Sequence, residues 1–330
     1  GVLSTIRTDD LAALPLKKLK DDLKDVDWES IDEIFFGNAN QAGEDNRNIA
    51  RMALLLADFP ESIPGITLNR LCASGMEAVI AGARMIKAEE GDFIIAGGAE
   101  SMSRAPFVMP KADSAFSRNA EIYDTTIGWR FVNPKMKSNY GIDSMPETAE
   151  NVAEKFQITR QDQDLFAYRS QIKAANSIDN GRISKEILTV TIKQKRKDDL
   201  TVNKDEHPRK TDLEKLSKLS TPFKNDGSVT AGNSSGVNDG AAALIIASED
   251  AIKKNNLKPI ARIVNAASSG VEPRIMGMGP VSATEKVLKK SNIKLNQIDT
   301  VEINEAFAAQ VLACTRELGM QDDDPRINPN

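Results

Sequence analysis

The sequence contains few of the residues on which metal and disulfide chemistry depend. A single histidine, His207, occurs among the 330 residues, which excludes a metal site built on several imidazoles. The two cysteines, Cys72 and Cys314, cannot form a framework of disulfides. We therefore expect no metal centre, and a reducing compartment, the cytoplasm, rather than secretion.

Long apolar runs and an excess of positive charge are also missing. No apolar run reaches the roughly 18 residues that a membrane span requires, so the sequence predicts no transmembrane helix. A formal net charge of −5 argues against binding to nucleic acids or to acidic membranes. The lysine-rich stretch at 193–198 is interpreted as a solvated edge rather than a binding patch.

The composition, 40% hydrophobic and 28% charged residues, is that of a globular chain long enough for two or more packed units. Apolar patterning predicts an α/β fold. Strands are predicted at 31–36, 66–71, 92–96, 241–247, 260–267 and 300–303. Helices are predicted at 9–20, 45–56, 75–87, 148–156, 161–176, 282–290 and 305–318. Because helices separate most of the strands, we expect a mostly parallel sheet.

The two ends of the sequence resemble each other. The tetrapeptides I-D-E-I at 31–34 and I-D-T-V at 298–301 each follow a predicted helix rich in leucine and lysine. The shift between the two tetrapeptides, from Ile31 to Ile298, is 267 residues. This similarity indicates duplicated α/β halves, although amphipathic helices followed by Ile-Asp also match by chance. The predicted division is an N-terminal half at 1–101 and 228–257, an inserted loop domain at 102–227 and a C-terminal half at 258–330.

A cysteine between a predicted strand and a predicted helix is the strongest candidate for a catalytic residue. The segment L-N-R-L-C-A-S-G-M-E-A at 68–78 places Cys72 in a turn of small residues directly before the helix. Backbone N–H groups at a helix N-terminus stabilise a thiolate, which makes such a sulfur a nucleophile. The alternative is a buried structural cysteine. Cys314 lies among apolar residues of a predicted helix, and we expect it in the core.

Two polar segments could bind a ligand. Asn304, in N-E-A-F-A, lies where a strand meets a helix, so its amide could hold a water or an oxyanion, or it could cap the helix. The loop V-T-A-G-N-S-S-G-V-N-D-G at 229–240 offers N–H groups and hydroxyls, or it is only a connector. It lacks the lysine and the spacing of a P-loop, so nucleotide hydrolysis is not supported. We interpret His207 as an ordinary loop residue.

Six motifs occur in the order and spacing found in thiolases, and the resemblance extends from residue 1 to residue 330. They are N-R-L-C-A-S-G-M-E-A, G-G-A-E-S-M-S, D-E-H-P-R, T-A-G-N-S-S-G-V-N-D-G-A-A-A, G-M-G-P-V and N-E-A-F-A-A-Q. The resemblance implies two duplicated α/β halves, layered α-β-α-β-α, with a loop domain inserted in the first half. It also implies a homo-oligomer, a dimer or a tetramer, and coenzyme A as a co-substrate without a tightly bound cofactor.

Two further segments resemble one group within that family. Y-D-T-T-I-G-W-R-F-V-N-P at 123–134 and S-M-P-E-T-A-E at 144–150 are similar to the 3-oxoadipyl-CoA (β-ketoadipyl-CoA) thiolases of aromatic catabolism. Biosynthetic acetoacetyl-CoA thiolases more often have His-Met-Gly where this chain has Ser144-Met145-Pro146. The implied reaction is CoA-dependent cleavage of a 3-oxoacyl-CoA to acetyl-CoA and a shortened acyl-CoA, here succinyl-CoA.

The resemblance assigns roles residue by residue. Cys72 is implied to attack the substrate carbonyl and to carry the shortened acyl group, which a second coenzyme A then accepts. Asn304 is implied to hold the water that stabilises the enolate oxygen of acetyl-CoA. The residues implied to line the substrate and CoA pocket are Met145, Arg209, Phe223, Ala231, Ser235, Met276, Ala306 and Phe307.

Two catalytic groups of the family have no match in the sequence. The activating histidine of a G-H-P turn and the second cysteine of a C-G-G turn would both follow Asn330. The 267-residue shift likewise places the counterpart of Cys72 after Asn330 and an opening strand before Gly1. We therefore expect residues 1–330 to be a fragment that is inactive alone. Alternatives to the 3-oxoadipyl-CoA thiolase are a general acetyl-CoA C-acetyltransferase and a non-catalytic, CoA-binding scaffold.

Overall fold

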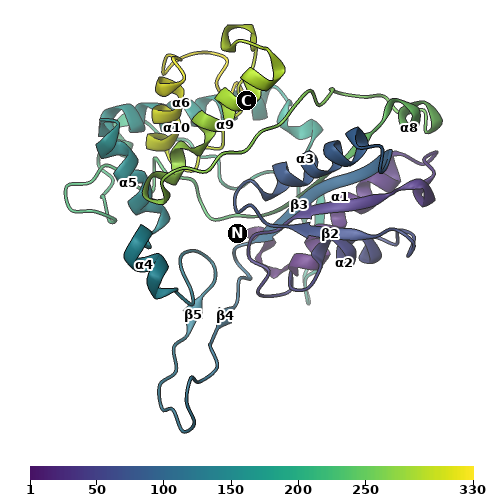
Figure 1. The fold of residues 1–330 in the computed structure, drawn as a ribbon, viewed down its shortest axis with the longest axis horizontal. Coiled ribbons are helices and arrows are strands. Elements are labelled where there is room, and N and C mark those ends of the chain that lie inside the picture. The colour runs from purple at the N-terminus through teal and green to yellow at the C-terminus, as the bar shows by residue number, and fades with distance from the viewer. The chain divides into compact units, whose positions relative to one another are not determined.

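The computed structural model describes all of residues 1–330 (Figure 1). The chain forms two compact units. The sheet unit comprises residues 1–130, 188–203 and 237–263, and the helical unit comprises 131–187, 204–236 and 264–330. The bounds of these two units differ from those of the predicted two halves and loop domain. The predicted division stays a prediction.

The sheet unit is built on a four-stranded sheet of order β2-β1-β3-β8. β1 (Glu33–Gly37) pairs in parallel with β2 (Gly65–Leu68) and β3 (Phe93–Ser101), and β8 (Asp239–Ala247) runs antiparallel to β3. In this register Phe36 lies between Thr67 and Gly97. The predicted mostly parallel sheet is thus confirmed, with β8 as its antiparallel member.

Helices cover both faces of this sheet (Figure 1). On one face, α1 (Thr8–Asp22) and α2 (Ile49–Leu56) pack against Ile34, Phe36 and Phe93. On the other face, α3 (Ser74–Lys87) packs against Phe35 and Ile94. The side chains of a strand alternate between the two faces, so consecutive apolar residues in β1 and β3 supply both layers of core.

Smaller elements complete the sheet unit. They are η1 (Val2–Thr5), η2 (Trp28–Ser30), α8 (Glu249–Lys254) and two antiparallel pairs, β4 (Phe107–Val108) with β5 (Tyr123–Asp124) and β6 (Val190–Ile192) with β7 (Leu200–Val202). A long loop joins β4 to β5, and the loop with its two strands forms the arm (residues 107–124) (Figure 1).

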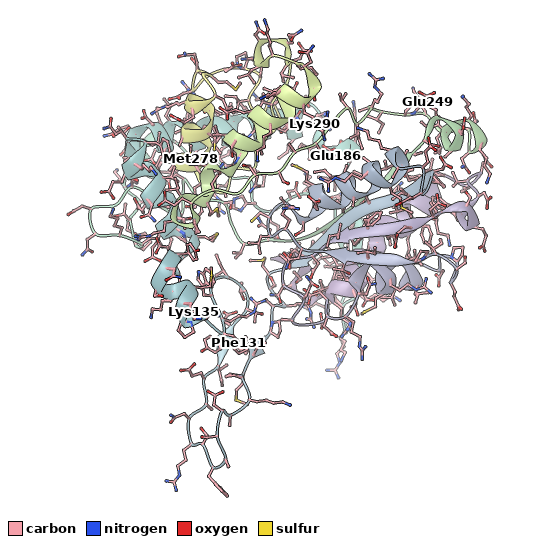
Figure 2. The ribbon with its side chains drawn as sticks, in the orientation of Figure 1. Phe131, Lys135, Glu186, Glu249, Met278 and Lys290 are labelled. Atoms are coloured by element: carbon pink, nitrogen blue, oxygen red, sulfur yellow. The ribbon has the colours of Figure 1, made fainter.

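The helical unit contains no sheet. Its elements are α4 (Pro134–Tyr140), α5 (Met145–Lys155), α6 (Arg160–Asp179), η3 (Ile183–Lys185), α7 (Leu213–Ser217), η4 (Pro273–Met278), α9 (Gly279–Ser291), η5 (Leu295–Gln297) and α10 (Ala308–Glu317). Its core is centred on α10, which is buried on all sides from Ala308 to Thr315. Met278, labelled in Figure 2, closes this core from the end of η4.

Three predicted elements are wrong or misplaced. Residues 260–267 form no strand, and Ile260 is fully exposed. Residues 300–303 contribute only a single bridge between Val301 and Ile327. α10 begins at Ala308 rather than at residue 305, because Phe307 is extended. Apolar residues favour a strand, but a strand forms only where a neighbouring strand accepts its backbone hydrogen bonds. No helix in the structure combines the length and the apolar character that crossing a membrane requires.

Candidate active site

Cys72 lies in the turn that joins β2 to α3, and its side chain is exposed. Ser74 stabilises the turn: its Oγ accepts from the Arg70 amide at 2.9 Å and donates to the Leu71 carbonyl at 2.6 Å. Asn69 Oδ1 accepts from the Leu71 amide at 2.9 Å. Leu71 adopts a left-handed φ of 49°, which these hydrogen bonds compensate. The predicted position of Cys72 at the start of a helix is confirmed, and the alternative of a buried structural cysteine is wrong.

The same turn rests on the end of β1. A Cβ added to Gly37 would lie 2.3 Å from the Ser74 carbonyl carbon and 2.4 Å from the Gly75 nitrogen. Asn69 Nδ2 also donates to the Ala39 carbonyl at 3.0 Å, which ties the turn to the segment after β1. Only glycine at position 37 therefore lets the N-terminus of α3 approach the sheet this closely.

The other predicted site residues all belong to the helical unit. The structure joins the segment 233–235 to the segment 306–308. The Ser235 amide donates to the Ala306 carbonyl at 3.0 Å, and the Ala308 amide donates to the Asn233 carbonyl at 2.9 Å. A bridge between Ser234 and Phe307 lies between these two bonds. Two motifs that lie about seventy residues apart in the sequence thus form one short ladder.

Asn304 lies just before this ladder. It is exposed, and its side chain has no hydrogen bond within the structure. The N-cap of α10 is Phe307, so the interpretation of Asn304 as a helix cap is wrong. An exposed amide without an internal partner is available to bind a ligand or a water.

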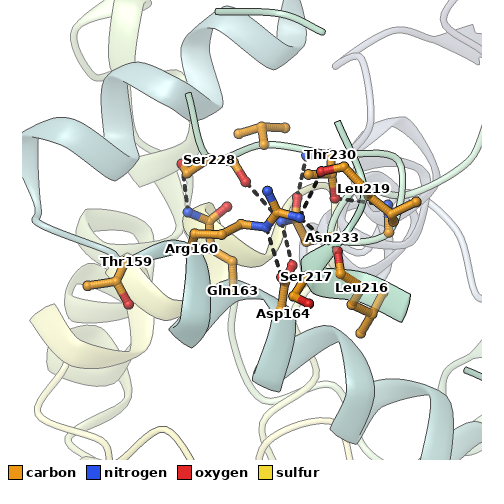
Figure 3. Close-up of polar contacts among 12 residues, drawn as sticks. Thr159, Arg160, Gln163, Asp164, Leu216, Ser217, Leu219, Ser228, Thr230 and Asn233 are labelled. Carbon is orange, nitrogen blue, oxygen red and sulfur yellow. Dashed lines mark hydrogen bonds and ion pairs between the residues drawn. The ribbon is translucent and has the colours of Figure 1, made fainter. Parts of the chain in front are cut away.

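The loop 228–234 is held by buried polar side chains of α5 and α6. The Glu150 carboxylate, 4% exposed, accepts from the Val229 amide at 2.8 Å and from the amide and hydroxyl of Ser228 at 2.9–3.1 Å. The Ser228 hydroxyl in turn accepts from Gln163 Nε2 at 2.8 Å, as Figure 3 shows. The backbone amides of Ser228 and Val229 therefore have acceptors without a neighbouring strand.

A second carboxylate, that of Asp164, holds the other end of this loop by a hydrogen bond (Figure 3). Asp164 Oδ1 accepts from Asn233 Nδ2 at 3.1 Å, and Asp164 Oδ2 accepts from Arg160 Nε at 2.8 Å. Arg160 also donates to the carbonyls of Leu216 and Leu219 at 2.7 and 3.0 Å. Asp164 is buried and Arg160 is partly exposed, and these additional hydrogen bonds leave few groups of the ion pair unsatisfied. Sequence reasoning missed Glu150, Asp164 and Asn233 because only the tertiary contacts identify their partners.

The remaining predicted pocket residues are spread over the helical unit. Met145 is the first residue of α5, and Met276 lies in η4. Asp143 connects these two elements, since it accepts from Arg274 Nε of η4 at 2.9 Å and from Asn151 Nδ2 of α5 at 2.7 Å. The hydrogen bond from Arg274 lowers the pKa of Asp143.

Three further residues of the predicted pocket are exposed: Ala231, Phe223 and Arg209. The Arg209 amide donates to Gln171 Oε1 of α6 at 2.8 Å. No contact in the structure brings the Phe223 or Arg209 side chain to Asn304, so their assignment stays a prediction.

The second cysteine is part of the core, as predicted. Cys314 is 0% exposed, and its thiol donates to the Gly277 carbonyl at 3.2 Å. Burial raises its pKa to about 11, so the thiol is protonated at neutral pH. His207 is half-buried in a loop. No group of three or more His, Cys, Asp or Glu side chains is placed to hold a metal ion.

Comparisons with known proteins assign the chain to a family. Residues 1–250 match the thiolase N-terminal domain, and residues 257–330 match the thiolase C-terminal domain. The chain is 57% identical, over its whole length and 82% of the relative, to a Pseudomonas aeruginosa protein named β-ketoadipyl-CoA thiolase. The same identity and coverage hold for the 3-oxoadipyl-CoA/3-oxo-5,6-dehydrosuberyl-CoA thiolase of Escherichia coli.

Solved structures have the same fold. The acetyl-CoA acetyltransferase of Bacillus anthracis matches with a TM-score of 0.90 at 38% identity, over 100% of this chain and 81% of that one. Human mitochondrial 3-ketoacyl-CoA thiolase matches with a TM-score of 0.88 at 37% identity, over 99% and 81% of the two chains. The family matches and the named relatives define the class of protein as an acyltransferase. The chain belongs to the thiolase family, which confirms the predicted fold class and enzyme class.

Substitution of Gly37 tests how closely α3 approaches the sheet. We expect Gly37→Ala to lower the free energy of unfolding by about 2–3 kcal/mol, because the added methyl overlaps backbone atoms that cannot rotate away. Gly75→Ala is the matched control, since a Cβ there meets no atom within 4 Å. Urea denaturation of the two variants measures the difference. Equal stability of Gly37→Ala and the unmodified protein would contradict the packing described here.

Substitution of Asp164 tests the second buried carboxylate. Asp164→Asn removes the charge that pairs with Arg160, and we expect a loss of about 3 kcal/mol in the free energy of unfolding. Glu214→Gln breaks the exposed pair between Glu214 and Lys218 and is the matched control, because surface ion pairs contribute little. Thermal unfolding compares both variants with the unmodified protein. Similar melting temperatures for the two variants would show that the pair between Asp164 and Arg160 is not a stabilising contact.

Proposed function

We propose that this protein is the thiolase that cleaves 3-oxoadipyl-CoA with coenzyme A to acetyl-CoA and succinyl-CoA. The observation that carries the proposal is an exposed Cys72, held at the start of α3, in a chain 57% identical to relatives named for this reaction. Coenzyme A is a co-substrate in this scheme, and no tightly bound cofactor takes part.

Cys72 supplies the nucleophile in this proposal. Its thiolate attacks the 3-oxo carbon of the substrate, and the bond between the second and third carbons breaks. The electron pair of that bond remains on acetyl-CoA as an enolate, which is then protonated, while the succinyl group stays on the sulfur. The thiol of a second coenzyme A attacks this thioester, which releases succinyl-CoA and restores the Cys72 thiolate. The groups that transfer protons are not assigned to any of residues 1–330.

The helical unit supplies binding and stabilisation in this proposal. Asn304 holds the water that donates to the enolate oxygen, which lowers the energy of the transition state where the negative charge develops. Its exposed amide without an internal hydrogen bond supports this role. The residues proposed to contact the acyl group and coenzyme A are Met145, Arg209, Phe223, Ala231, Ser235, Met276, Ala306 and Phe307.

Two other functions are alternatives. A general acetyl-CoA C-acetyltransferase is supported by the fold match to the Bacillus anthracis enzyme, at the lower identity of 38%. A non-catalytic CoA-binding scaffold would need neither an exposed thiol nor a turn that fixes it. The location proposed is the cytoplasm, which fits two cysteines that are both free.

A substrate comparison tests the proposed reaction. We expect the complete gene product to convert 3-oxoadipyl-CoA and coenzyme A to succinyl-CoA at least about tenfold faster, in kcat/KM, than it cleaves acetoacetyl-CoA. Cys72→Ser should abolish both activities, and Cys314→Ser should retain them, because only the Cys72 sulfur is exposed. Mass spectrometry of the products measures each rate. Comparable rates with the two substrates would favour the general acetyltransferase.

We also propose that the protein is a homo-oligomer, a dimer or a tetramer. The arm exposes a row of apolar side chains: Phe107, Met109, Phe116 and Ile122. β2 is an outer strand of the sheet, and Ile66 in it is 41% exposed. Exposed apolar patches and unpaired strand edges are typical of subunit interfaces.

Light scattering after size-exclusion chromatography measures the number of copies. We expect a mass of two or four copies at micromolar concentration, and a smaller mass for the double variant Phe107→Asp with Phe116→Asp. Leu200→Asp, in the β6–β7 pair, is the control and should leave the mass unchanged. A monomeric unmodified protein would show that the proposal of an oligomer is wrong.

A further inference from the structure

One buried side chain bonds to the residues on both sides of Asn304. Asn328, 8% exposed, accepts from the Ile303 amide through Oδ1 at 2.8 Å. Its Nδ2 donates to the Ile303 carbonyl at 2.9 Å and to Glu305 Oε1 at 2.7 Å. The amide of Asn328 thus pairs with Ile303 as a neighbouring strand would, and also holds the residue that follows Asn304.

Glu305 extends this connection to α6. Its second carboxylate oxygen, Oε2, accepts from the Ser170 hydroxyl at 2.6 Å. Ser170 and Glu305 line a cavity of about 130 Å³ together with Phe166 and Ile327. The side chain of Glu305 therefore points into the helical unit, whereas the side chain of Asn304 is exposed.

The backbone of Asn328 is itself hydrogen-bonded to a neighbouring segment. Its backbone amide donates to the Val301 carbonyl at 2.9 Å, and Pro329 follows it directly. Its φ of 41° lies in the left-handed region, which asparagine tolerates better than most residues. The segment around Asn304 forms no strand, so these side-chain bonds replace the ladder that would otherwise fix it.

We infer that Asn328, acting together with Glu305, is a positioning residue of the thiolase reaction. It holds the backbone of Ile303 and the side-chain carboxylate of Glu305, the two neighbours of Asn304, so that the free amide of Asn304 is presented in one orientation. This inference rests on the proposed role of Asn304 in stabilising the enolate. A displacement of about 1 Å at such a group can lower a rate by about 100-fold without removing any catalytic atom.

The substitution Asn328→Asp tests the inference. Aspartate has the shape of asparagine, but the donor group Nδ2 is replaced by a carboxylate oxygen that faces the Ile303 carbonyl and the Glu305 carboxylate. We expect kcat for 3-oxoadipyl-CoA cleavage by the complete gene product to fall about 10- to 100-fold, with little change in the KM for coenzyme A. Asn330→Asp is the matched control, because Asn330 makes a similar but exposed contact with Glu302. It should leave kcat unchanged.

Two double variants separate positioning from a general loss of structure. Adding Glu305→Gln to Asn328→Asp reverses donor and acceptor between the two side chains, and it should recover part of kcat. Combining Asn328→Asp with Asn304→Ala should lower kcat no further than Asn304→Ala alone, because the effects of residues that act through one another are not additive. If Asn328→Asp fails to fold, Ser170→Ala gives a milder test, with a fall in kcat of about two- to fivefold expected at unchanged KM.

Each contrary result has a distinct meaning. Unchanged kcat in Asn328→Asp, or additive losses with Asn304→Ala, would overturn the inference while the proposed function stands. Full activity of Asn304→Ala would show that the proposed role of Asn304 is wrong. The inference about Asn328 would then be wrong as well. Absence of cleavage by the unmodified gene product would overturn the proposed function itself.

Discussion

Buried carboxylates hold the loop at 228–234 of the helical unit in place. Glu150 and Asp164 accept hydrogen bonds from Ser228, Val229 and Asn233, and no strand of the helical unit could do so instead. Because buried backbone donors require acceptors, the loop would otherwise have to move into solvent. Fixed in this way, residues 233–235 form the ladder with residues 306–308 that precedes α10.

The two candidate catalytic side chains are held by different means. Cys72 is fixed by neighbours in its own turn, chiefly Ser74, and by the absence of a side chain at Gly37. Asn304 is fixed by residues far away in the sequence, namely Asn328 through Ile303 and the loop 233–235 through Ala306. The Cys72 turn thus depends mainly on hydrogen bonds within itself and on the close approach at Gly37, whereas the segment of Asn304 depends on side chains and loops from other parts of the helical unit.

This difference also explains what the sequence could predict. Periodicity identified α1 to α3 and β1 to β3, and the turn around Cys72 followed from small residues between a strand and a helix. The predicted strand at 260–267 failed because apolar residues alone cannot supply a strand partner. Glu150 and Asn328 have no local signal at all. Their roles depend on contacts with Ser228 and Ile303, which only the folded chain brings together.

The central claim is that the sulfur at the start of α3 carries the acyl group. Incubation of the complete gene product with 3-oxoadipyl-CoA, in the absence of free coenzyme A, should leave the succinyl group on the enzyme. Peptide mass spectrometry after an acid quench measures where it is attached. We expect a succinyl thioester on Cys72 and none on the buried Cys314. An unmodified Cys72 in a protein that has released acetyl-CoA would contradict it.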